Sequence, residues 1–170
     1  MNENIESVLS LKVIGNQWFW GYEYSDFNEV EFTSYMINCS DLKIGDFRLR
    51  EVDNKIHLPI NINCKLLCTS NDVIHSFAIP SIGIKIDCIP GRINQSFINV
   101  NRPSIYTGGC SEICGTEHSF MPIVIKICSN TMFANWIESF DSIVNDSKEI
   151  LNKEVYIKKW WHFWFFGYQP

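Results

Sequence analysis

The sequence has no run of about 18 or more apolar residues, the length that a helix needs to cross a bilayer. Residues 1–10 lack the basic head and apolar centre of a secretory signal and the arginines of an organelle presequence. The chain is therefore expected to be made inside its compartment or to have lost a leader. Basic residues are also scarce, with 14 Lys and Arg against 19 Asp and Glu, a formal net charge of -5. This balance argues against a nucleic-acid partner and suits a basic protein.

The cysteines do not form the framework of a disulfide-stapled domain, because there are seven of them at irregular spacings. Five are predicted to be small buried hydrophobic residues, since they lie among apolar or strand-like neighbours: Cys39, Cys64, Cys68, Cys88 and Cys128. The other two, Cys110 and Cys114, belong to a loop that is rich in further metal donors.

That loop covers residues 110–122. Cys110 and Cys114 stand four residues apart, His118 follows four residues later, and Met121 comes three after that. These soft and borderline donors favour copper or zinc over magnesium or calcium. Three glycines around them let the backbone bend tightly. On these residues alone, a copper site, a zinc site and a small disulfide ring all remain open.

Hydrophobic periodicity predicts an all-β domain that fills most of the chain. Residues 56–68 alternate between apolar and polar over their whole length, which predicts one strand with His57 facing outward and Pro59 at a sheet edge. Four further strands are expected, at 15–24, 82–87, 92–100 and 121–127. In the first of them Trp18, Trp20, Tyr22 and Tyr24 should share one side. Many short strands separated by turns are typical of a β-sandwich or a small Greek-key barrel.

The two ends of the chain differ from this pattern. Residues 1–10 are a polar lead-in, and from Ser129 apolar residues recur at helical spacing. We expect a helix at 129–154 on the outside of the barrel, with Asn130 or Thr131 as its N-cap. Residues 155–170 form an aromatic tail that is too short to span a membrane. Such an apolar tail should dock to a partner or lie at the membrane interface.

Five motifs together resemble one known family. They are Gln17-Trp18-Phe19-Trp20 with Tyr22-Glu23-Tyr24, Arg50-Glu51-Val52-Asp53-Asn54, His75-Ser76-Phe77, Pro90-Gly91-Arg92-Ile93-Asn94-Gln95, and the loop 110–122. From about Val13 to Phe140 the chain resembles the copper-bearing domain of cytochrome c oxidase subunit II. The resemblance implies a cupredoxin-like Greek-key barrel at residues 11–128. Phe19 departs from the family, where tyrosine is common, and a small effect is expected.

The resemblance implies a binuclear copper centre. It assigns the ligands to His75, Cys110, Glu112, Cys114, His118 and Met121. The two thiolates would bridge both ions, each histidine would bind one ion through a ring nitrogen, the methionine would be a weak axial donor, and Glu112 would offer its backbone carbonyl. The Glu112 side chain would also reach a magnesium ion at the interface with the catalytic subunit. Hydrogen bonds should fix the tautomer of each histidine, although the sequence does not name the partners.

The resemblance also implies partners. Trp18 matches the aromatic residue through which electrons enter from cytochrome c, and four carboxylates lie near positions of the acidic docking surface: Glu23, Asp26, Glu29 and Asp72. The chain would then pass electrons to haem in the catalytic subunit I, as part of a proton-translocating oxidoreductase. That complex lies in the mitochondrial inner membrane with this domain facing the intermembrane space, or in bacteria with the domain on the periplasmic side.

Family members generally begin with two membrane-spanning helices, and this sequence starts almost at the first strand of the domain. We expect a split subunit in which a separate polypeptide carries the helices, so that this chain meets the membrane only peripherally through the complex. A shortened chain is the other explanation. Two further functions remain open: a stand-alone copper electron-transfer module, and the copper domain of a nitrous oxide reductase, which would need a large catalytic domain on the same chain.

Overall fold

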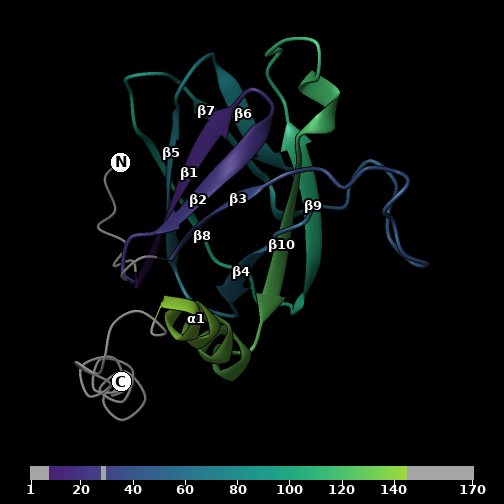
Figure 1. Cartoon of the computed structure of the whole chain (residues 1–170). Helices are drawn as coiled ribbons and strands as arrows, with labels where there is room; N and C mark the ends of the chain where they lie inside the picture. The colour runs from purple at the N-terminus through teal and green to yellow at the C-terminus, as the bar shows by residue number, and fades with distance from the viewer. Residues whose placement is uncertain (1–7, 28–29, 145–170) are drawn as a thin grey trace.

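The computed structural model describes residues 8–27 and 30–144 and contains two five-stranded sheets (Figure 1). The first sheet has the order β3-β2-β1-β5-β8, with β1 Leu9–Asn16, β2 Phe19–Tyr24, β3 Glu31–Ser34, β5 Cys64–Ser70 and β8 Asn94–Ile98. The second has the order β4-β10-β9-β6-β7, with β4 Ile56–Pro59, β6 His75–Ile79, β7 Ile84–Cys88, β9 Ser104–Cys110 and β10 Pro122–Cys128. Two 3-10 turns, η1 Pro80–Ile82 and η2 His118–Phe120, and one helix, α1 Asn130–Val144, complete the described elements.

Alternating side chains build the core between the sheets. Strand β1 buries every second residue, among them Leu11 and Val13. Strand β2 buries Trp20, Tyr22 and Tyr24, which confirms that these aromatic residues share one face. The start of the expected strand at 15–24 is wrong, because residues 15 and 16 belong to β1 and Trp18 lies in the turn before β2, where it is only partly buried.

The strand directions bring three connections to one end of the molecule. Strand β1 runs parallel to β5, so the turn after Asn16 and the turn after Ser70 leave the first sheet at the same end. In the second sheet the start of β6 lies beside the end of β9, where Phe77 pairs with Cys110. The β1–β2 turn, the β5–β6 turn and the β9–β10 loop therefore meet at this end.

The single strand expected at residues 56–68 is wrong. Two strands, β4 and β5, occupy the range and belong to different sheets. Between them Asn61 adopts a positive φ of 58° and its N–H donates to the Val100 carbonyl, which turns the chain. Apolar residues keep alternating through this turn, so the period of two does not reveal the change of sheet. The edge position expected from Pro59 is confirmed, because β4 is the outermost strand of its sheet.

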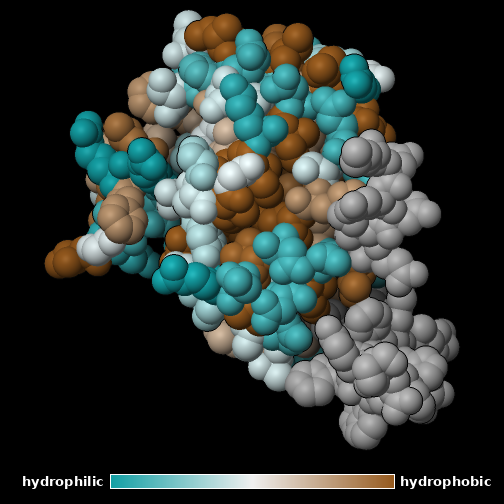
Figure 2. Space-filling model, turned by 180° about the vertical axis from the view of Figure 1, so that it is seen from behind, coloured by the Kyte–Doolittle hydropathy of each residue, from teal (hydrophilic) through white to brown (hydrophobic). Residues whose placement is uncertain are grey.

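Four of the five cysteines that were expected to be buried are buried: Cys64, Cys68, Cys88 and Cys128. The expectation is wrong for Cys39, which is exposed. Cys39 belongs to the segment between β3 and β4, which projects from the sheets (Figure 1). The same segment exposes Ile44, Phe47 and Leu49, and in Figure 2 the projecting lobe has a hydrophobic tip.

Helix α1 packs on the outside of the sheets against β4, as expected from its apolar spacing. Its Phe133 and Ile137 are buried, and the Trp136 ring stacks on His57 with centroids 4.4 Å apart. His57 is thus half-buried under the helix rather than free in solvent. The N-cap is Ser129, whose hydroxyl accepts a hydrogen bond from the Met132 N–H, and not one of the two residues that follow it.

The aromatic tail at 155–170, the end of the expected helix beyond Val144, and Glu29 lie outside the described residues. Within residues 8–27 and 30–144 no helix is long and apolar enough to cross a membrane.

Candidate metal centre

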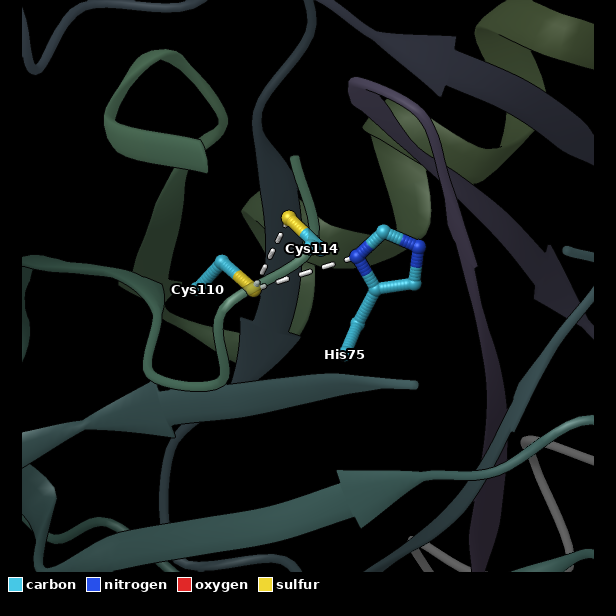
Figure 3. Close-up of side chains that lie close together, drawn as sticks. All are labelled: His75, Cys110 and Cys114. Carbon is cyan, nitrogen blue, oxygen red and sulfur yellow. Dashed lines mark hydrogen bonds between the residues drawn. The ribbon is translucent and has the colours of Figure 1, made fainter. Parts of the chain in front are cut away.

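Three side chains with metal-donor atoms converge at the end of the molecule where the β1–β2 turn, the β5–β6 turn and the β9–β10 loop meet. His75 begins β6 and is fully buried, Cys110 ends β9, and Cys114 is buried in the loop that follows. One donor atom from each of the three lies within 4.8 Å of the others (Figure 3). The Cys110 sulfur is 3.9 Å from that of Cys114 and 3.8 Å from His75 Nδ1.

The other three predicted donors lie against the two sulfurs. His118 Nδ1 is 3.4 Å and the Met121 sulfur 3.6 Å from Cys114 Sγ. The Glu112 carbonyl oxygen is 3.2 Å from Cys110 Sγ. The structure thus brings together all six predicted donors. Two thiols, two imidazoles and a thioether form a soft donor set that fits copper.

Two glycines make room for this arrangement. A Cβ on Gly15 of β1 would stand 2.7 Å from the His75 ring, so only glycine lets the imidazole lie against that strand. Gly115 has a φ of 129°, and a Cβ there would stand 2.9 Å from the Trp18 ring. The Trp18 ring therefore packs directly against the donor loop at Gly115, the residue that follows Cys114.

Asp72 holds the ring of His75. Its Oδ1 lies 2.9 Å from His75 Nε2, and its Oδ2 accepts a hydrogen bond from the Gln17 N–H at 2.7 Å. Because Nε2 is engaged by the carboxylate, Nδ1 is the nitrogen that faces the sulfurs. Burial lowers the pKa of His75, but hydrogen bonds with Cys110 and Asp72 outweigh burial and leave the pKa raised. The sequence placed Asp72 only on a docking surface, and its position three residues before His75 is the signal for this second role.

Two side chains of the first sheet tie down the donor loop. The Gln17 side-chain amide donates to the Cys114 carbonyl at 2.7 Å, and Trp20 Nε1 donates to the Met121 carbonyl at 3.2 Å. Sequence reasoning gave neither residue this role. Both belong to the Gln17-Trp18-Phe19-Trp20 motif, so the motif itself is the signal that could have found them.

The two thiols differ in acidity. Burial raises the pKa of Cys110, but hydrogen bonds with His75 and with the backbone at Ser76 and Glu112 lower it to about 7. Burial and the neighbouring Cys110 raise the pKa of Cys114 to about 12. In the metal-free protein the first proton therefore leaves Cys110.

The remaining predicted residues do not gather at this site. Glu23 pairs with Lys12 at 2.7 Å and lies toward the far end of β2 from Trp18, and Asp26 follows that end and accepts a hydrogen bond from the Ser10 N–H. The carboxylate of Glu112 is half-exposed, and its magnesium role stays a prediction.

Sequence comparison decides the family. Residues 9–128 match the family model described as cytochrome c oxidase subunit II, periplasmic domain. The chain is 53% identical to cytochrome c oxidase subunit 2 of Ctenocephalides felis over 139 residues. The aligned residues make up 82% of this chain and 61% of that protein. The chain belongs to the cytochrome c oxidase subunit II family. It spans about three fifths of the length of the curated relatives it matches.

Solved structures of subunit II agree with this assignment. The periplasmic domain of subunit II from Bradyrhizobium japonicum matches with a TM-score of 0.75 and 38% identity, covering 82% of this chain and 98% of that one. A mixed disulfide intermediate between a thioredoxin-like protein and subunit II matches with a TM-score of 0.71, 37% identity and coverages of 83% and 96%. The predicted resemblance and the cupredoxin-like all-β fold of the subunit II domain are therefore confirmed.

Proposed function

We propose that this chain is the electron-entry relay of a cytochrome c oxidase, receiving electrons from cytochrome c at a binuclear copper centre and passing them to haem in the catalytic subunit. The observation that carries the proposal is the convergence of six donors in a subunit II fold, one from the start of β6 and five from the end of β9 and the loop that follows it. The whole complex, rather than this chain alone, would reduce oxygen and translocate protons.

Each donor residue would supply a different ligand atom. Cys110 and Cys114 would hold copper as thiolates, His75 and His118 through Nδ1, and Met121 with the Glu112 carbonyl as weaker donors. Copper bound by these residues would supply one-electron redox chemistry. The chain's contribution is to keep the donors still, because Asp72, Gln17 and Trp20 fix a ligand ring and the loop backbone. Donors that are already in place limit the rearrangement that accompanies each electron.

Electron entry is proposed at Trp18. Its ring packs on Gly115 next to Cys114, so it touches the donor loop without belonging to it. A net charge of -5 favours the approach of a basic partner such as cytochrome c. Among the predicted docking carboxylates that the structure describes, Asp72 is the one that lies beside this entry point, with its side chain 33% exposed.

Assembly is the second part of the proposal. Subunit I would receive the electron, and Glu112 would share a magnesium ion with it. The exposed Ile44, Phe47 and Leu49 give the segment between β3 and β4 an apolar surface of the kind that partners cover. The complex would lie in the mitochondrial inner membrane with this domain facing the intermembrane space, or in bacteria on the periplasmic side.

Metal counting with electron spin resonance on the copper-loaded full chain tests the centre. Two coppers per chain and a spectrum of one electron shared between them are expected. A single copper, or zinc in place of copper, would overturn the binuclear assignment and favour a simple carrier module. The variant Cys114→Ser should lose the shared-electron spectrum, while Cys39→Ser, at an exposed thiol far from the donors in sequence, should keep it.

Co-purification tests the relay role separately. A tagged chain expressed in its own cells should be recovered with a haem-containing oxidase. Recovery of the copper-loaded chain alone, under conditions that keep the oxidase intact, would contradict the assembly proposal and leave the copper centre standing.

A further inference from the structure

Two buried cysteines outside the metal centre lie on strands that meet across the core. Cys68 lies on β5 of the first sheet and Cys88 ends β7 of the second, and these two strands are in contact. Both side chains are fully buried. A parallel bridge joins Ser70 to Pro90, two residues beyond each cysteine, and brings Cys68 and Cys88 into register. We propose that Cys68 and Cys88 are a second redox pair, which closes as an inter-sheet disulfide when the chain folds under oxidising conditions.

The surroundings of Cys68 and Cys88 favour an uncharged disulfide over a charged metal site. The Tyr22 hydroxyl is buried and has no hydrogen-bond partner among the described residues. The neighbouring Cys88 thiol and burial both raise the pKa of Cys68. Monovalent copper held by two thiolates would bury a net negative charge here, which is costly in an apolar core. A disulfide carries no charge, so the apolar core accommodates it without this cost.

The chemistry needs an oxidant of one class, a low-molecular-weight disulfide. One cysteine, as thiolate, attacks this disulfide and forms a mixed disulfide while one small thiol leaves. The other cysteine then attacks the mixed disulfide, and the second small thiol leaves. In total the two cysteines lose two protons and two electrons, and the co-reactant is reduced to two thiols. Since neither sulfur is exposed in the folded chain, both steps must occur before β5 and β7 close on each other.

This pair has the opposite redox requirement to the metal donors. Cys110 and Cys114 have to be reduced to bind a metal, whereas a bond between Cys68 and Cys88 ties the sheets together. Cys88 pairs with His75 in the β6–β7 ladder, so the bond would anchor the strand beside a metal donor to the opposite sheet. The inference does not rest on the proposed electron relay.

The test is refolding of the full metal-free chain in a buffer of oxidised and reduced glutathione. Free thiols are then alkylated in denaturant and the peptides are examined by mass spectrometry without reduction. A linked peptide pair containing Cys68 and Cys88, lighter by two hydrogens, is expected. Recovery of both residues as alkylated thiols, while an exposed thiol such as Cys39 carries glutathione, would overturn the proposal.

Variants distinguish a specific Cys68–Cys88 disulfide from random disulfide formation and from a metal site. Refolded with the same buffer, the double variant Cys110→Ser, Cys114→Ser should still form the linked pair, because the competing donor thiols are absent. Cys68→Val should remove a melting-temperature gain of roughly 5–10 °C that oxidation gives the unmodified chain. The buried control Cys64→Val should retain that gain. Copper retained at Cys68 and Cys88 by the double variant, with no linked peptide, would also overturn the proposal and identify a metal site instead.

Discussion

Asp72 shows how one side chain connects two parts of the site. Its two carboxylate oxygens engage His75 Nε2 and the Gln17 N–H, so the turn that carries Trp18 and the buried histidine share one anchor. A carboxylate in this position selects the ring nitrogen that faces the sulfurs and makes that nitrogen a better donor. Its position therefore bears on metal affinity as well as on any docking role.

Asp72→Ala should lower copper affinity by about 10- to 100-fold, because His75 loses the partner that orients its ring. Competition with a chelator measures the affinity, and electron spin resonance should report an altered copper spectrum. Asp26→Ala, at a carboxylate remote from the donors, serves as the matched control. Unchanged copper affinity in Asp72→Ala, with weakened cytochrome c binding alone, would reduce Asp72 to a docking residue.

Cys110 should be the reactive thiol of the metal-free centre. Its pKa of about 7 lies below the usual value of 9.0, so thiolate appears as the pH rises through 7, and alkylation by iodoacetamide should accelerate with a midpoint near that pH. Stability should also increase with pH. Between pH 7 and 9.0 the Cys110 thiol binds more protons in the unfolded chain than in the folded chain, so the free energy of unfolding rises with pH. Cys114, buried and with a pKa of about 12, should react slowly throughout. Peptide mass spectrometry after timed quenching gives both rates, and equal rates would contradict the assignment.

At the scale of elements, helix α1 and strand β4 form a small aromatic layer beneath the sheets. Trp136 stacks on His57 at 4.4 Å and also meets Phe140 at 4.9 Å and Tyr24 at 5.3 Å. This layer lies at the strand ends opposite to the donors, since Tyr24 ends β2 and Trp18 precedes it. Changes in the layer should therefore alter stability and leave the metal centre intact.

Trp136→Ala should lower the free energy of unfolding by about 2–3 kcal/mol, somewhat less than for a fully buried tryptophan because the ring is only partly buried. Urea unfolding of the metal-free protein measures the change. Met132→Ala, at an exposed position on the same helix, should change stability by less than about 0.5 kcal/mol. A loss of the copper spectrum in folded Trp136→Ala would show that the helix and the site are coupled after all.

The elements also show what the sequence could predict. Alternation located β2, β7, β8 and β10, and helical spacing located α1, because each depends on which neighbours are buried. Strands β1, β3, β6 and β9 were not predicted. Alternation could not show that residues 56–68 change sheets, since the turn at Asn61 preserves the period of two. The donors were predictable because their types and order are specific. The roles of Asp72, Gln17 and Trp20 were not, because a hydrogen bond between residues 55 or 101 positions apart depends on how the sheets close.

For the whole molecule, the metal centre joins connections from both sheets. The β9–β10 loop is tied to the other sheet by Gln17 of the β1–β2 turn and by Trp20 of β2. A bound ion should therefore stabilise the sandwich as a unit and order this end of it.

Removal of copper by a chelator should lower the melting temperature. With free ion at 100 times its dissociation constant, binding contributes about 2.7 kcal/mol, which corresponds to roughly 5–10 °C for a chain of this size. Hydrogen exchange should then increase in the turns around Gln17 and Asp72 and in the loop 110–122, with little change in β4 and α1. Uniform loss of protection along the chain would contradict this local effect.

The parallel pairing of β1 with β5 has a mechanical consequence. Adjacent strands of one rigid sheet carry the Trp18 turn and the Asp72 turn, so neither can swing independently of the other. If electrons enter at Trp18, their route to the sulfurs has a fixed length and contains no hinge. Once the partner is bound, viscous cosolvents such as glycerol should leave the intracomplex transfer rate unchanged, whereas a gated route would slow in proportion to viscosity.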